Sequence, residues 1–142
     1  MQYVNSYLVP NIKSKKKVIM TANAHRFQKL CESIFALSSC VRFAGVIDKM
    51  GRLVAGGMGE GIRSLELDSE KLYLEFALRS EMRKDFDAEF GKTIFSFTER
   101  EKIKLVSFPL DGSYILRVSM ERKEPHNEII EKTLRIIRNM EC

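Results

Sequence analysis

The chain has 142 residues, of which 44% are hydrophobic and 30% charged, and its formal net charge is +5. This length fits one domain with one core, because a domain of about 150 residues buries roughly 70% of its unfolded surface, and the composition excludes a disordered or disulfide-dependent protein. No apolar run reaches the roughly 20 residues that a membrane span requires, and the start of the chain lacks the pattern of a signal peptide. We therefore expect a cytoplasmic protein.

The first twenty residues show no sustained hydrophobic period and contain Pro10. They end in a lysine-rich stretch, and without its lysines the chain would carry about one net positive charge, which is too little to indicate a nucleic-acid-binding face. We predict a basic, partly ordered arm over residues 1–20 and a single domain over residues 21–142. The lysines that we assign to an anion contact are Lys13, Lys15, Lys16 and Lys17.

A first helix is predicted where apolar residues recur at spacings of three and four, from Phe27 to Phe35. Thr21 or Asn23 precedes this pattern, and both residue types cap helices well. We therefore expect the helix, and with it the domain, to begin near Asn23.

Two strands follow, over residues 41–48 and 52–56. The tight turn between them contains Gly51, which supplies the unusual dihedral angles that a short hairpin needs. The glycine-rich stretch 56–61 comes next, and it fits neither the P-loop pattern nor the dinucleotide-binding pattern. We interpret this stretch as a flexible connector.

A second helix is predicted from a cap at Asp68 or Ser69 to Gly91, which is suited to ending a helix. Its first half is apolar over a wide arc, in which only Glu75 is clearly polar. One apolar stripe is enough for a helix that lies on a sheet, so a second stripe indicates a further apolar surface such as a partner subunit. The residues that we assign to this dimer contact are Leu72, Tyr73, Leu74, Phe76, Ala77 and Leu78.

The second half of this helix narrows to a single apolar stripe through Met82, Phe86 and Phe90. Charged residues flank the stripe on both sides, as on a solvated helix face. We therefore expect these three side chains to pack on the chain's own domain.

Three more strands are predicted over residues 92–98, 102–108 and 114–120, where apolar residues alternate with others. In the last strand, Arg117 lies on the side opposite to the apolar residues. Pro125 opens a final amphipathic helix. The order helix, two strands, helix, three strands, helix predicts an α+β fold with a five-stranded antiparallel sheet and helices on both faces.

Few residues are available for catalysis or metal binding. Neither His25 nor His126 lies in a metal-ligand spacing, and no serine lies in a GxSxG motif. Cys31 falls on the apolar face of the first helix, which favours a core role, and the three cysteines form no CxxC pair. We expect no enzymatic activity, no cofactor and no metal.

The order of elements over roughly residues 23–140 resembles the roadblock and dynein-light-chain family within the profilin-like and longin-like group. A more local likeness connects the chain to an archaeal family of small proteins of unknown function. The segments that carry this second likeness are 42–48, 51–57, 91–96, 101–104 and 108–110.

The roadblock resemblance implies that the first and last helices lie on one face of the sheet and the middle helix on the other. Members of that family typically dimerise through the middle helix and the third strand, and they act as scaffolds or regulators of small GTPases and motors. The resemblance therefore implies a homodimer that binds a regulatory protein such as a small GTPase. Two alternatives stay open, a small-ligand sensor of profilin-like type and nucleic-acid association through the lysine-rich arm.

Overall fold

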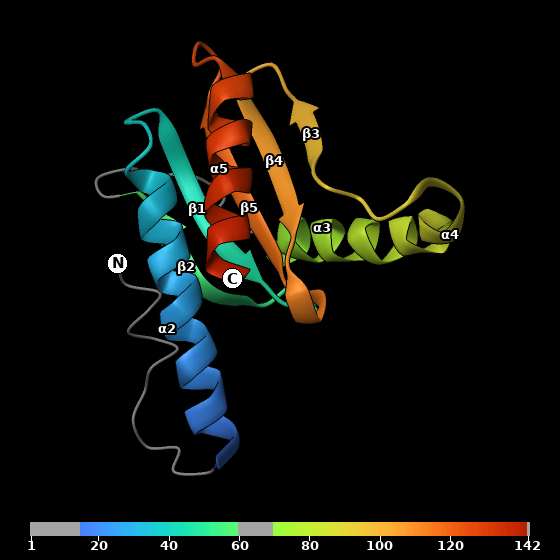
Figure 1. Cartoon of the computed structure of the whole chain (residues 1–142). Helices are drawn as coiled ribbons and strands as arrows, with labels where there is room; N and C mark the ends of the chain where they lie inside the picture. Colours follow the sequence, from blue (N-terminus) through green and yellow to red (C-terminus); the bar gives the residue numbers. More distant parts are fainter. Residues whose placement is uncertain (1–14, 60–69, 142) are drawn as a thin grey trace.

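The computed structural model describes residues 15–59 and 70–141. They form one five-stranded antiparallel sheet in the order β2-β1-β5-β4-β3, with helices on both faces (Figure 1). The predicted fold class is therefore confirmed. The elements in chain order are α2 (Lys15–Phe35), β1 (Val41–Ile47), β2 (Leu53–Met58), α3 (Glu70–Arg83), the 3₁₀ turn η2 (Lys84–Phe86), α4 (Asp87–Phe90), β3 (Ser96–Glu99), β4 (Ile103–Pro109), the 3₁₀ turn η3 (Asp111–Ser113), β5 (Ile115–Glu121) and α5 (His126–Glu141).

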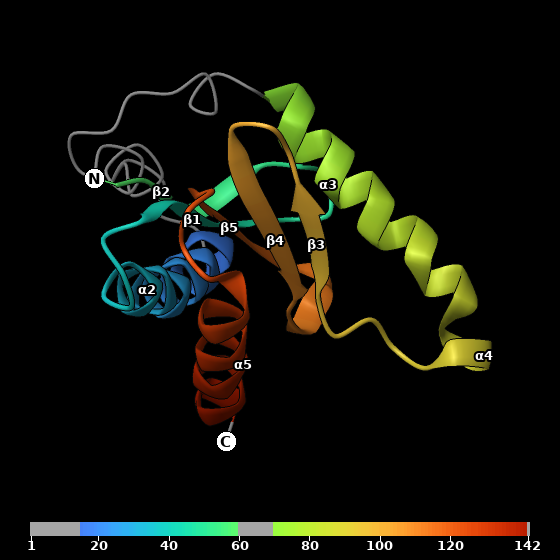
Figure 2. The same ribbon diagram turned by 90° about the horizontal axis from the view of Figure 1, so that it is seen from above.

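Helices α2 and α5 lie side by side on one face of the sheet, whereas α3 crosses the other face (Figures 1 and 2). The larger core lies under α2 and α5. Strand β5 contributes Leu116, Val118 and Met120 to it, because alternate residues of a strand point to the same face. The helices contribute residues at helical spacing, namely Phe27, Leu30, Cys31 and Ile34 from α2 and Ile129, Ile130 and Ile137 from α5.

Helix α2 begins at Lys15, earlier than the expected start near Asn23. Residues 15–20 are therefore helical, and Thr21 and Asn23 lie inside the helix instead of capping it. The hydrophobic period did not reveal this first part because the helix extends past the sheet there (Figure 1), and buried residues of α2 are described only from Phe27 onwards. The rest of the predicted arm, residues 1–14, lies outside the described residues, and the domain boundary stays a prediction.

Strand β2 includes Gly56 and Gly57, so the interpretation of these residues as a connector is wrong. Gly56 has a φ of +79°, and a Cβ atom there would lie 2.1 Å from the carbonyl oxygen of Ala44 and 2.7 Å from the Sγ atom of Cys31. The missing side chain therefore allows α2 to pack closely on the hairpin. The stretch from residue 60 to residue 61 lies outside the described residues.

Strand β3 covers only Ser96–Glu99. It therefore begins four residues later than the strand that was predicted over residues 92–98. As predicted, Gly91 ends the preceding helix, with a φ of +80°. Figure 2 shows that α4 ends away from the sheet, and residues 92–95 are needed to lead the chain back to it. Strand β3 is one of the two edge strands, and β4 is its sheet neighbour.

Candidate interaction surface

The side of α3 that faces away from the sheet carries apolar side chains. They recur every four residues along α3, η2 and α4, the spacing of neighbours on a helix surface. Their exposed fractions run from 42% at Leu74 to 80% at Phe90. We call this set the outer stripe, and it consists of Leu74, Leu78, Met82, Phe86 and Phe90.

Exposed apolar side chains continue beyond the outer stripe towards the sheet edge. Ile94 is 67% exposed and Phe95 is 40% exposed, and both precede β3 directly. Across the described part of the chain, Met50 is the one exposed large apolar side chain that lies elsewhere. The exposed apolar surface is therefore concentrated between α3 and the edge of the sheet.

The opposite side of α3 packs on the sheet of its own chain. Tyr73 and Ala77 are buried there, and Phe76 is partly buried against the same cluster. Residues spaced by three and four share one side of a helix, so these three side chains face the sheet together. The strand and hairpin residues in contact with them form a second, smaller core of Phe43, Ile47, Leu53, Met58 and Ile115.

The six residues assigned to a dimer contact are thus divided between the two sides of α3. Leu74 and Leu78 belong to the outer stripe, whereas Leu72 is half-buried and the other three lie on the sheet side. The wide apolar arc therefore contains one stripe for the chain's own core and one exposed stripe. The dimer contact itself stays a prediction.

The expectation that Met82, Phe86 and Phe90 pack on the chain's own domain is wrong. Their exposed fractions are 67%, 56% and 80%. The helical segment runs past the edge of the sheet (Figure 2), so its second half has no strand beneath it. Their four-residue spacing was visible in the sequence, but such spacing does not show whether a sheet lies underneath.

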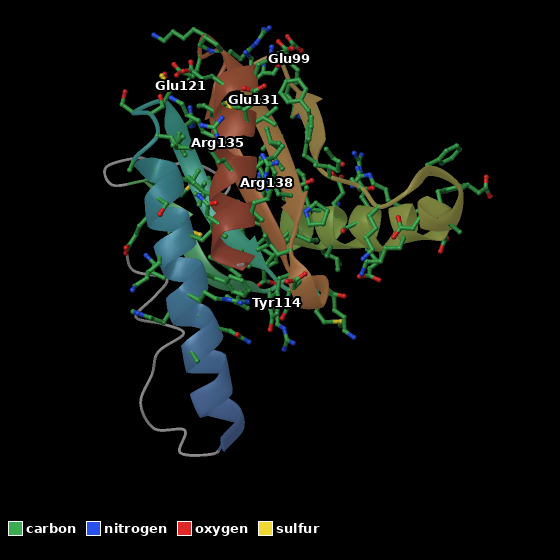
Figure 3. All side chains as sticks on the ribbon, in the orientation of Figure 1. Glu99, Tyr114, Glu121, Glu131, Arg135 and Arg138 are labelled. Carbon is green, nitrogen blue, oxygen red and sulfur yellow. The ribbon has the colours of Figure 1, made fainter. Side chains whose placement is uncertain are left out.

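The exposed side of α5 is charged, in contrast to α3. Figure 3 shows Glu131, Arg135 and Arg138 along this helix, and all three are exposed. Their spacing of four and three residues places them on one side. The two faces of the molecule therefore present different chemistry to the solvent.

The lysines assigned to an anion contact are only partly described. Lys13 lies outside the described residues, and Lys15, Lys16 and Lys17 form the first turn of α2. This turn lies at the end of the helix that extends past the sheet (Figure 1). The anion contact stays a prediction.

Two cysteines lie in the described residues. Cys31 of α2 is fully buried in the larger core, which confirms its core role, and burial raises the pKa of its thiol. Cys40 is half-buried, and a hydrogen bond with Glu124 raises the pKa of its thiol. Both shifts favour the neutral thiol, which is the less reactive form.

The two histidines lie in different surroundings. His25 is exposed on α2, whereas the ring of His126 stacks on Phe97 with 4.3 Å between the ring centroids. Within residues 15–59 and 70–141, no three His, Cys, Asp or Glu side chains gather as a metal site would require. No helix in these ranges is long and apolar enough to cross a membrane.

Solved structures of Roadblock/LC7 domains and of profilins share this fold. The Roadblock/LC7 domain from Streptomyces avermitilis matches with a TM-score of 0.62 at 9% identity, over 80% of this chain and 93% of that domain. MglB with a tetrameric arrangement matches with a TM-score of 0.61 at 15% identity, over 84% of this chain and 93% of that chain. Schizosaccharomyces pombe profilin matches with a TM-score of 0.57 at 10% identity, over 80% of this chain and 95% of the profilin chain.

Such low identities establish the fold alone, and they confirm the roadblock-like and profilin-like resemblance. No curated protein matches the sequence. The model of the Family of unknown function (DUF6659) matches residues 19–141, which is most of the chain. The fold of the chain is that of the Roadblock/LC7 domains, and the chain belongs to the family DUF6659.

Proposed function

We propose that this chain is a non-enzymatic protein-interaction module that acts as a homodimer, with the outer stripe and the edge of β3 as the contact. The exposed stripe is the observation that carries the proposal. With side-chain areas of about 150–250 Å², exposed fractions of 40–80% between Leu74 and Phe95 amount to several hundred Å² of apolar surface. Monomers rarely display so large an apolar patch, and stable interfaces bury about 800 Å² per partner.

A second copy of the chain is the occupant that this surface suits best. In a two-fold dimer each patch meets the same patch of the other copy, so an apolar stripe covers an apolar stripe. Strand β3 lies at the sheet edge beside the stripe, and an edge strand offers backbone groups for pairing with another strand. The tetrameric arrangement of MglB supports self-association on this fold.

The proposal includes no catalysis, because the alkyl and aromatic groups of the stripe cannot transfer protons. A regulatory protein such as a small GTPase is the second partner that we propose, on the strength of the roadblock resemblance. We place both in the cytoplasm. This second partner is tested by whether the wild-type protein captures a small GTPase and a variant with an altered outer stripe does not.

Sedimentation velocity at micromolar concentration tests the homodimer. The wild-type chain, with a subunit mass of 16.4 kDa, is expected to sediment as a dimer. Leu78 is 53% exposed, so Leu78→Glu adds a charge to the proposed contact without entering the core. We expect this variant to dissociate at least tenfold more readily while its melting temperature changes by less than about 4 °C.

Asn127→Glu is the matched control, because it introduces the same charge at an exposed position of α5, on the other face of the sheet. This variant should stay dimeric. A monomeric wild-type protein at these concentrations would refute the homodimer. Loss of stability in step with dissociation in Leu78→Glu would place Leu78 in the core of the subunit.

A further inference from the structure

A cation is buried between the sheet and α3. Arg117 lies in β5, and its side chain is fully buried on the face that α3 covers. The guanidinium carbon lies 4.9 Å from the ring centroid of Phe43 on the sheet. It also lies 4.9 Å from the ring of Phe76 and 5.7 Å from the ring of Tyr73, both on α3. The guanidinium therefore contacts aromatic rings from both layers.

The neighbouring strand positions make room for this stack. On either side of Arg117 in the sheet lie Gly45 of β1 and Ser107 of β4. A Cβ atom at Gly45 would lie 2.7 Å from the Cζ atom of Phe43, so the ring of Phe43 occupies the space above the glycine. The small neighbours thus allow both the ring and the guanidinium to lie between the sheet and the helix.

Each end of α3 lies against a turn that connects two strands of the sheet. Near its start, Gly51 approaches so closely that a Cβ atom there would lie 2.7 Å from the Cα atom of Leu74. Just past its end, the Nζ atom of Lys84 donates a hydrogen bond to the Oγ atom of Ser113 at 3.1 Å. Two residues of α3 are buried. Arg117 therefore contacts a helix that has a small buried surface of its own.

We propose that Arg117 is a positioning residue that fixes the orientation of α3 on the sheet, and with it the orientation of the outer stripe relative to β3. Cation–π attraction requires the cation to lie over the ring face. Because Tyr73 and Phe76 are three residues apart on one side of the helix, rotation or sliding of α3 removes at least one ring from the guanidinium. Apolar contact is non-directional and tolerates such movement.

Hydrogen exchange of the full chain, followed by mass spectrometry, measures how stably α3 is held on the sheet, because a helix that is poorly anchored opens more often. Arg117→Lys keeps the charge but loses the planar group, and Arg117→Met keeps most of the length but loses the charge. We expect both variants to lose at least tenfold in the protection of α3 amides, with α2 and α5 unchanged. The effect on self-association rests on the proposed function, and there we expect an at least tenfold weaker dimer.

Val118→Ala is the matched control, because Val118 is the next residue of β5 and is buried on the opposite face. It should lower the protection of all elements together and leave the dimer affinity unchanged. Phe76→Leu removes one ring of the stack while Arg117 remains, and it should reproduce the loss at α3 even if the Arg117 variants fail to fold.

Protection of α3 that falls only in step with α5 in the Arg117 and Phe76 variants would overturn the inference. Full protection of α3 in Arg117→Met would do the same. If the wild-type chain proves monomeric, the proposed function fails, but the exchange of α3 amides still decides the role of Arg117.

Discussion

Gly56→Ala tests the close packing of α2 on the β1–β2 hairpin. Gly56 has a φ of +79°, and a side chain in this region costs about 1–2 kcal/mol. The new methyl group would also lie 2.1 Å from the carbonyl oxygen of Ala44, so the backbone itself must move. Overpacking of a well-packed core costs about 1–3 kcal/mol. We therefore expect a loss of roughly 2–5 kcal/mol in the free energy of unfolding.

Gly91→Ala separates the two contributions to this loss. Gly91 has nearly the same φ, +80°, but a Cβ atom there would have nothing within 4 Å. With its ψ of 170°, Gly91 lies in a region that essentially only glycine adopts, so this variant should lose only the about 1–3 kcal/mol that such backbone strain costs.

Urea and thermal unfolding, followed by circular dichroism, measure both variants. At about 4 °C per kcal/mol for a domain of this size, Gly56→Ala should melt roughly 8–20 °C below the wild type. Equal destabilisation of the two variants would refute the reasoning, because it would mean that the methyl group at Gly56 meets no obstacle.

Other predictions concern the core, the surface and the pH dependence. Leu116→Ala removes a fully buried side chain from the larger core, and we expect a loss of about 2–5 kcal/mol in urea unfolding. Arg122→Ala breaks a half-exposed ion pair with Glu99, and the same assay should show less than about 1 kcal/mol. Burial raises the pKa of the Cys31 thiol, so the folded chain keeps this proton after the unfolded chain has released it. Stability should therefore fall as the pH rises above about 9, by up to about 1.4 kcal/mol per pH unit, and Cys31→Ala should lack this contribution. An unchanged pH profile in Cys31→Ala would contradict the shift.

The sheet and its helices could be predicted because burial on one face leaves a periodic pattern. Strand β5 alternates between the larger core and the α3 side, and α5 places Ile130, Leu134 and Ile137 at helical spacing. Such patterns show which side of an element is buried. They do not show depth, so Arg117 was assigned to the correct side of its strand but not to a buried position.

The misplaced start of α2 and the unexpected exposure after α3 have a common physical cause. The start of α2 and the segment after Arg83 run past the sheet, so no strand covers them and neither has a face that must be apolar. The hydrophobic period of the sequence therefore does not mark where these helical segments begin or leave the sheet. The exposure of Met82 depends on where the sheet ends, which is decided by strand pairing far along the chain. Local sequence carries no information about that edge.

The strand order has a consequence for how this protein can change over time. The β1–β2 hairpin and the β3–β4–β5 meander each fold from consecutive segments, and they are joined through the pairing of β1 with β5. The connection from β2 to β3, which includes α3, is the longest connection between consecutive strands. Doubling the length of such a loop costs only about 0.6 kcal/mol. Mutation and selection can therefore remodel α3, the element that we propose for binding, while the strands that support it stay unaltered.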